Sequence, residues 1–221
     1  MPAYVFAQNS TILQVIDSNN FRKNKMNQPV KKRAYVFLFD GFSDWEIAYL
    51  TPEINKSKAC ELLYFSTQGQ TVHSMGRMKV VPDVALEQVN TSEIDLLILP
   101  GGTAWEKGEN NVLDQLVMEL FEQGKTIAAI CAASAYLGQK GFLDKLQHTS
   151  NDLQYLKGVA PQYLGEKYYL NTLAAADQNI ITANGIAPIE FAREVFKKLN
   201  LYSDIETEQW YQLFKNGVWQ E

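Results

Sequence analysis

Short apolar runs without internal polar breaks recur along the chain from residue 33 onward. Runs of four to eight apolar residues are typical of strands that are buried on both faces of a parallel sheet. The sequence therefore predicts buried strands at 33–40 (RAYVFLFD), 60–67 (CELLYFST), 95–99 (DLLIL) and 126–130 (TIAAI).

Segments with helical spacing of apolar residues fall between and after these runs. The predicted helices cover 45–55, 111–123, 132–140, 188–199 and 205–215. Pro52 lies inside the first of them, so a kink or an early stop is expected there. In the last helix, Trp210, Leu213 and Phe214 form one apolar stripe, and Gly217 follows as the predicted end.

Two further segments have the pattern of paired strands. Residues 70–84 carry Gly76 between two apolar stretches and predict a hairpin. Residues 168–176 and 179–183 flank a predicted turn at 177–179. Strands that alternate with helices on short connections predict an α/β three-layer sandwich, with a mainly parallel sheet flanked by helices.

The domain organisation follows from the same pattern. Residues 33–221 contain no internal repeat, low-complexity tract or Pro/Gly-rich linker, and we expect them to form a single domain. Residues 1–32 hold two short apolar bursts and then a basic stretch, which predicts an N-terminal extension of uncertain order and role. A secretory signal would place its charges before a continuous apolar run, so secretion is not expected.

Composition and charge exclude several classes of protein. The 221 residues are 46% hydrophobic and 20% charged, which excludes collagen, coiled coil and wholesale disorder. The sequence contains no run of 18 apolar residues, so no membrane span is predicted. A net charge of −5 does not suit a nucleic-acid binder. Two cysteines are too few for a disulfide framework, and they favour a reducing, cytoplasmic location.

The string KTIAAICAASAYLG at 125–138 carries the most chemical information. A buried strand runs directly into Cys131, and small residues then open a helix, as in a nucleophile elbow. The free N–H groups of the first helical turn would favour the thiolate form. The alternative is that Cys131 is only a small buried hydrophobe. Cys60 has no comparable context and keeps that plainer interpretation.

The end of a second predicted strand is expected to lie beside the turn at Cys131. Gly101 and Gly102 follow the strand at 95–99, and ligand sites of open α/β sheets form beyond the carboxyl ends of strands. The backbone N–H groups of Gly102 and Ala132 would together bind an oxyanion.

Four motifs, FLFDGFSDWE, ILPGG, AAICAAS and ITANGIAPIEF, give the sequence a resemblance to the ThiJ/PfpI (DJ-one) superfamily over about residues 33–200. The resemblance implies a flavodoxin-like, class I glutamine amidotransferase-like fold. It implies that Cys131 is the elbow nucleophile and that Gly102 and Ala132 line the pocket. It also implies that Glu46 is a carboxyl group that hydrogen-bonds the sulfur, whereas the residue alone would suggest a solvated acid in a first helical turn.

The sequence departs from this pattern in its histidines. Peptidase-like members of the superfamily carry a histidine directly after the nucleophile, where this chain has Ala132. His148 falls near the segment that often places a polar residue over the cysteine, and Thr149 or Asn151 are alternatives for that place. Proteolysis by a Cys-His-Glu triad is therefore disfavoured.

These observations favour a cysteine-dependent hydrolase or lyase that acts on a small electrophilic substrate, such as a reactive carbonyl, an amide or a related compound. In this reading Glu46, aided by His148, moves the proton. The alternative is a non-catalytic redox- or stress-responsive protein whose Cys131 is oxidised to sulfenate or sulfinate. An amidotransferase-like subunit and an intracellular peptidase are less favoured.

We expect a small-molecule substrate, no cofactor, no metal, and no nucleic-acid or membrane partner, because no glycine-rich nucleotide loop, metal-ligand cluster or basic patch is evident. The resemblance implies a homodimer.

Overall fold

A single sheet organises the fold in the computed structural model, which describes residues 31–57 and 60–219. Its strands lie in the order β5-β2-β1-β6-β7-β9-β8, and each neighbouring pair is parallel except β8 with β9. The strands are β1 (Lys32–Phe37), β2 (Cys60–Ser66), β5 (Val84–Ala85), β6 (Leu96–Leu99), β7 (Thr126–Ile130), β8 (Ala174–Asp177) and β9 (Ile180–Ala183).

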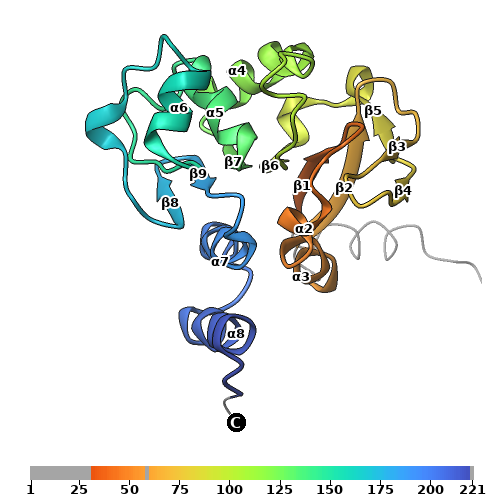
Figure 1. The fold of residues 1–221 in the computed structure, drawn as a ribbon. Helices are drawn as coiled ribbons and strands as arrows, with labels where there is room; N and C mark the ends of the chain where they lie inside the picture. The colour runs from red at the N-terminus through yellow and green to blue at the C-terminus, as the bar shows by residue number, and fades with distance from the viewer. Residues whose placement is uncertain (1–30, 58–59, 220–221) are drawn as a thin grey trace, which may run out of the picture. The chain divides into compact units, whose positions relative to one another are not determined.

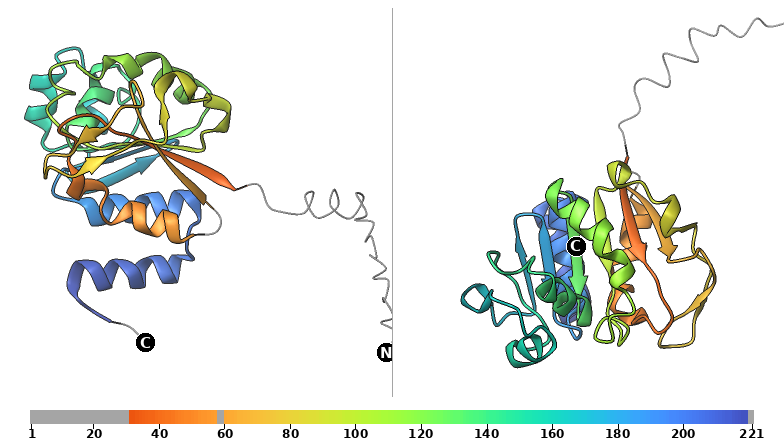
Figure 2. Two further views of the ribbon diagram at one scale, coloured as in Figure 1. Left: turned by 90° about the vertical axis from the view of Figure 1, so that its right-hand side faces the viewer. Right: turned by 90° about the horizontal axis from the view of Figure 1, so that it is seen from above.

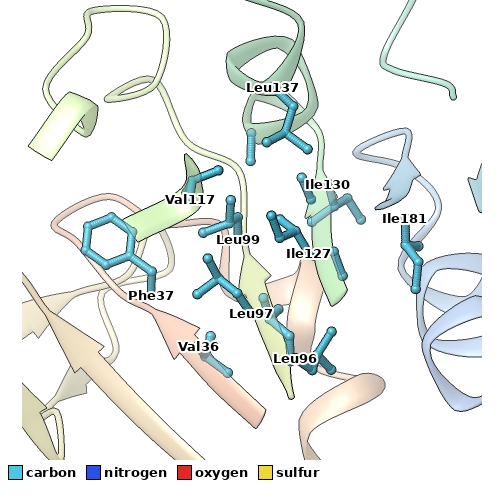
Figure 3. Close-up of a cluster of buried hydrophobic side chains, with 14 of the residues drawn as sticks. Val36, Phe37, Leu96, Leu97, Leu99, Val117, Ile127, Ile130, Leu137 and Ile181 are labelled. Carbon is cyan, nitrogen blue, oxygen red and sulfur yellow. The ribbon is translucent and has the colours of Figure 1, made fainter. Parts of the chain in front are cut away.

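The centre of this sheet is apolar on both faces. Every residue of β6 and β7 is buried, which explains why these strands have no polar alternation in the sequence. Figure 3 shows their side chains together with Val36 and Phe37 of β1. The four buried strands predicted from the apolar runs are thus present, with ends shifted by at most three residues.

Helices cover both faces of the sheet (Figures 1 and 2). The helices α4 (Asp114–Glu122), α5 (Ala132–Gln139) and α6 (Leu153–Val159) lie on one face. The helices α3 (Leu50–Lys56) and α7 (Pro188–Leu199) lie on the other, and α8 (Asp204–Asn216) packs on α7 away from the sheet. This arrangement confirms the α/β three-layer sandwich with a mainly parallel sheet, to which α8 adds an outer helix.

The helix predicted at 45–55 is two helices in the structure. α2 (Asp44–Ile47) ends before α3 begins at Leu50. Pro52 has no N–H with which to bond the carbonyl four residues earlier, so a continuous helix would lose a bond and clash. In the structure, Pro52 is the third residue of α3. The N–H groups of the first turn of a helix have no partner within the helix, so proline is tolerated at this position.

Two local predictions need correction near the end of the sheet. The strand expected at 168–176 is shorter, because Glu166–Tyr168 form a 3₁₀ turn and only Ala174–Asp177 pair with β9. Helix α6 was not predicted at all. Its N-terminus is capped by Asp152, whose side chain accepts hydrogen bonds from the N–H groups of Gln154 and Tyr155.

A hairpin and three further 3₁₀ turns lie in the connections between these elements. The predicted hairpin is present as β3 (Val72–His73) and β4 (Lys79–Val80), which pair antiparallel. The other 3₁₀ turns are Leu86–Gln88, Thr91–Glu93 and Asn111–Leu113.

Residues Lys31–Glu221 group into one compact unit. The extension predicted for 1–32 lies outside the described residues except for Lys31 and for Lys32, which begins β1. None of the helices that the structure describes is long and apolar enough to cross a bilayer.

Candidate active site around Cys131

Cys131 joins β7 to α5 in a strained backbone conformation. Its φ is 60° and its ψ is −129°, in a region that side chains with a Cβ rarely occupy and that costs about 1–3 kcal/mol. Its N–H donates to the carbonyl of Ala183 at the end of β9, at 2.9 Å, which helps to hold the turn. Strain of this kind persists where the surrounding structure enforces it, and it concentrates at functional sites.

Two glycines let other strand ends approach this cysteine. A Cβ on Gly101 would lie 2.6 Å from the Cβ of Cys131 and 2.8 Å from Oε2 of Glu46. A Cβ on Gly185 would lie 2.8 Å from the sulfur. Contacts under 3.0 Å are shorter than van der Waals packing allows, so the site requires glycine at both positions.

Glu46 reaches the site from α2 and is completely buried. Its Oε2 accepts a hydrogen bond from the Gly101 N–H at 2.5 Å. Its Oε1 is buried without a hydrogen-bond partner in the static structure, although Cys131 and Ser43 lie near enough to lower the pKa of the carboxyl. A proton on Oε1 would give this oxygen a hydrogen bond to donate to the sulfur.

Burial governs the titration of both groups. It raises the pKa of Glu46 to about 7, against the smaller lowering effects of Gly101, Cys131 and Ser43. Burial and then the charge of Glu46 raise the pKa of Cys131 to about 11, while Asn151 and the Ala132 N–H lower it. The helix N-terminus alone therefore does not yield the thiolate expected from the sequence. The two groups form a coupled pair, which holds one proton at pH values between about 7 and about 11.

Asn151 is the residue that contacts the sulfur from the other side. Its Nδ2 donates to Sγ of Cys131 at 3.4 Å, and its Oδ1 accepts from the Gly185 N–H at 2.9 Å. Its own carbonyl accepts from Nδ2 of Asn184 at 2.7 Å. Of the three residues considered for this place, the structure brings Asn151 to the cysteine.

His148 is engaged elsewhere. It is fully buried, with Nδ1 at 2.6 Å from the carbonyl oxygen of Leu146 and Nε2 at 2.6 Å from the hydroxyl of Tyr163. Burial lowers its pKa, which keeps the ring neutral. Because both ring nitrogens are occupied, the geometry does not support the expected proton-shuttling role of His148.

Thr149 is likewise occupied, since its hydroxyl donates to the carbonyl of Thr172.

The two backbone amides named from the sequence lie at the ends of neighbouring strands, β6 and β7. The Ala132 N–H lies near enough to the sulfur to lower the pKa of Cys131. Gly102 has a φ of 146°, and a Cβ there would lie 2.8 Å from the carbonyl oxygen of Gly41. Only glycine accepts this conformation without strain.

Three residues near the site, Trp45, Glu106 and Tyr155, were not predicted from the sequence. The indole Nε1 of Trp45 donates to the carbonyl of Gly185 at 3.2 Å, which anchors an exposed aromatic ring beside the cysteine. Tyr155 of α6 donates its hydroxyl hydrogen to Oε1 of Glu106 at 2.7 Å. The signal that could have located Tyr155 is Asp152, an N-cap residue type just before α6.

Within residues 31–57 and 60–219, no three His, Cys, Asp or Glu side chains gather closely enough to hold a metal ion.

Comparison with known proteins identifies relatives of this chain. The sequence profile of the DJ-1/PfpI family matches residues 32–198. A Bacillus subtilis protein named as the uncharacterized protease YoaZ is 36% identical over 191 residues, which covers 83% of this chain and 91% of that protein. A protein named as a deglycase in Pyrococcus abyssi is 31% identical over 119 residues, or 53% of this chain and 71% of that protein.

Solved structures agree with the sequence comparison. A ThiJ/PfpI family protein from Bacillus anthracis is 36% identical, has a TM-score of 0.81, and matches 85% of this chain and 92% of its own. A DJ-1 superfamily protein from Agrobacterium tumefaciens is 35% identical with a TM-score of 0.78, over 84% of this chain and 98% of its own. The resemblance in the four sequence motifs is confirmed, and the chain belongs to the DJ-1/PfpI family.

Proposed function

We propose that the protein is a cysteine-nucleophile enzyme that acts on a small electrophilic compound, a reactive carbonyl, an amide or a related molecule. The observation that carries this proposal is the strained turn at Cys131, which holds the sulfur between Glu46 and Asn151. The names of the relatives, which include protease and deglycase, support an enzyme of the DJ-1/PfpI type.

The reaction begins when Sγ of Cys131 attacks the electrophilic carbon of the substrate. A carbon–sulfur bond forms, and the electron pair of the carbonyl π bond moves to oxygen. The N–H groups of Gly102 and Ala132 stabilise the resulting oxyanion.

Glu46 handles the proton in this step. With a pKa near 7, its carboxyl exchanges a proton at neutral pH, as a general acid or base requires. Its Oε1 accepts the thiol proton as the sulfur attacks. The Asn151 amide, which already donates to the sulfur, stabilises the developing thiolate.

The protease names of relatives are not a guide to this site. Ala132 follows the nucleophile where a peptidase-like site would have histidine, and both ring nitrogens of His148 are occupied. A small substrate whose carbon is already reactive needs no imidazole base. We therefore favour a hydrolase or lyase over a peptidase, working in a reducing cytoplasm that keeps the Cys131 thiol free.

The test is turnover of methylglyoxal and of a chromogenic ester by the full chain. Activity should disappear in Cys131→Ser and persist in the matched control Cys60→Ser, which alters the other, structural cysteine. Glu46→Gln should slow turnover while leaving the chain folded.

Two other outcomes overturn the proposal. Turnover that survives Cys131→Ser would show that another group performs the reaction. Rapid peroxide oxidation of Cys131 to sulfinate, with no turnover of either substrate, would instead identify the redox-responsive alternative. In that case Glu46 would act by hydrogen-bonding the oxidised sulfur.

A further inference from the structure

Trp45 is a large aromatic residue that the fold leaves at the surface and holds in place there. It is 45% exposed, although Glu46, the next residue, is completely buried. An indole N–H at a protein surface can donate to water, but Nε1 of Trp45 donates to the backbone carbonyl of Gly185 at 3.2 Å. This hydrogen bond restrains the ring while part of its apolar surface stays uncovered.

Gly185 connects this ring to the nucleophile. A Cβ on Gly185 would lie 2.8 Å from the sulfur of Cys131, so the backbone of Gly185 lies directly against the reacting atom. The carbonyl of Gly185 holds Trp45, and its N–H holds the Asn151 side chain. Cys131 itself is only partly buried. The indole is therefore placed beside an accessible sulfur.

Two further large apolar residues are exposed close to Trp45. Ile186 follows Gly185 directly and is exposed. Met75 is exposed as well, and its N–H donates to the carbonyl of Phe42, three residues before Trp45, at 2.8 Å. Single exposed apolar residues are normal on a protein surface, whereas several that gather at one place mark a binding site. We call Trp45, Met75 and Ile186 the apolar rim.

The side chains that contact the sulfur carry no positive charge. Asn151 is neutral, and Glu46 is an acid with a pKa of about 7. An anionic substrate would find no cation in these two contacts and would be repelled by the ionised Glu46. A neutral substrate with an apolar substituent avoids this repulsion, and the substituent gains free energy when it leaves water. Small-molecule sites commonly combine an apolar or aromatic lining with a few polar groups in this way.

We propose that Trp45 is a specificity-determining residue, whose exposed indole binds an apolar or aromatic substituent of a neutral substrate while Cys131 attacks the electrophilic carbon. Because the hydrogen bond to Gly185 already restrains the ring, binding costs little side-chain conformational entropy. Contacts away from the reacting carbon can then contribute to the stabilisation of the transition state. This inference rests on the proposed function and narrows its substrate class.

The experiment compares two neutral alkylating reagents, iodoacetamide and N-benzyl iodoacetamide, which share the reactive carbon and differ by one aromatic ring. The rate of each at Cys131 of the full chain is measured at pH 8 by mass spectrometry. The ratio of the benzyl rate to the iodoacetamide rate is then divided by the same ratio for N-acetylcysteine. In the wild type, this normalised ratio should favour the benzyl reagent by about 3- to 10-fold, the scale of one aromatic pair.

Replacement of the ring should remove this preference. Trp45→Ala should bring the normalised ratio close to one and leave the iodoacetamide rate within about twofold of the wild type, as is usual for a surface substitution. Trp45→Phe retains a ring without the N–H and should keep more of the preference than Trp45→Ala. Trp219→Ala is the matched control, because Trp219 is 75% exposed but follows the outer helix α8. The control should keep the wild-type ratio, and thermal unfolding of each variant checks the fold.

Several outcomes would overturn the inference. One is an unchanged ratio in Trp45→Ala, and another is a ratio in Trp45→Phe that is no higher than in Trp45→Ala. An equal fall in both rates in Trp45→Ala would show that the ring acts on the cysteine and not on the substituent. Light scattering tests a second copy of the chain as the occupant of the apolar rim. A lower assembly mass in Trp45→Ala, with the ratio unchanged, would assign Trp45 to a contact between copies.

The alkylation readout separates this inference from the proposed function. A benzyl preference at Cys131 that depends on Trp45, without turnover of any substrate, would retain the apolar binding site and reject the enzyme. Turnover by the wild type without a benzyl preference would retain the enzyme and reject the role of Trp45.

Discussion

Cys131 and Glu46 are two acidic groups that burial prevents from ionising together. Each raises the electrostatic cost of the other's charge, and the hydrogen-bond donors around them are divided between the two. Gly101 donates to the carboxyl group, while Asn151 and the Ala132 N–H favour the charged sulfur. Reactivity at this site therefore depends on which atom holds the shared proton.

The pH profile of Cys131 alkylation should reveal this pair. In the wild type, the rate should first rise near pH 7, where the pKa of Glu46 lies, and rise again toward about 11. Glu46→Gln should remove the first rise and lower the thiol pKa below the wild-type value, because the repelling carboxylate charge is gone. Cys60 serves as the internal control. Identical profiles for the two proteins would contradict the coupling.

Substitution of Gly101 tests how closely the ends of β6 and β7 must approach each other. In Gly101→Ala the new Cβ would lie 2.6 Å from the Cβ of Cys131, so the turn or Glu46 must move. We expect turnover to fall by about 100-fold, the scale of an ångström-sized misplacement. Gly158→Ala is the control, since a Cβ there meets open space on α6. That change should leave turnover intact and stabilise the helix by up to about 1 kcal/mol.

At the scale of elements, most contributions to the site come from the carboxyl end of a strand or from the helix that follows it. Gly101 and Gly102 follow β6, Cys131 follows β7, and Gly185 follows β9. This edge is where open α/β sheets place their ligand sites. The segment after α5 adds Asn151, and its shape depends on buried polar contacts.

His148 supports that segment, so its replacement should affect stability and leave the cysteine unchanged. His148→Phe leaves the Tyr163 hydroxyl and the Leu146 carbonyl without their partner. We expect the free energy of unfolding to fall by about 1–3 kcal/mol for such unpaired buried groups. Denaturant unfolding and Cys131 alkylation together provide the measurement. Slow alkylation in a fully stable variant would instead indicate that His148 has a role in the chemistry.

Across the whole molecule, the buried Glu46 links the site to folding stability. Its folded pKa of about 7 is above the ordinary value of 4.5, so the folded chain binds this proton more tightly than the unfolded chain. The stabilisation is complete below the ordinary value and is lost as the pH rises from there through the folded pKa. The total loss, which is reached just above pH 7, amounts to about 3 kcal/mol.

Glu46→Gln should therefore change the pH dependence of unfolding. The variant stays neutral, so at pH 8 it should be more stable than the wild type by up to about 3 kcal/mol. The difference should shrink toward pH 5. Urea denaturation of both proteins at several pH values measures it, with Cys131→Ser in both backgrounds to prevent oxidation. A constant difference at all pH values would mean that Glu46 is not protonated in the fold.

The homodimer implied by the family resemblance stays a prediction for the assembled molecule. Light scattering of the full chain should give twice the chain mass of 25.1 kDa. Within the described residues, the ring of Trp210 packs on Phe196 and Tyr49, so this part of the stripe on α8 is explained inside one chain. Trp219 is largely exposed beyond α8. A mass of one chain at every concentration would contradict the prediction.

Local pattern alone was enough to predict most of the fold. The buried strands, the helix at 188–199 and the turn at Cys131 depend on short runs of apolar or small residues, which determine local structure wherever both faces of a sheet are covered. Cys131 and the glycine strand end were predictable for a similar reason, because both follow buried strands and parallel strands end at one edge. Glu46 was expected only from the family resemblance, because its residue type and position alone indicate a solvated acid in a first helical turn.

Tertiary structure decided what surrounds the sulfur. His148 and Asn151 are three residues apart, and nothing in the sequence distinguishes which side chain turns toward Cys131. The choice follows from buried hydrogen bonds to distant partners, Tyr163 for the histidine and Gly185 for the asparagine. The pKa of the cysteine was undetermined for a related reason. Helix geometry, which the sequence predicts, favours the thiolate, but burial, which only the packed structure establishes, opposes it.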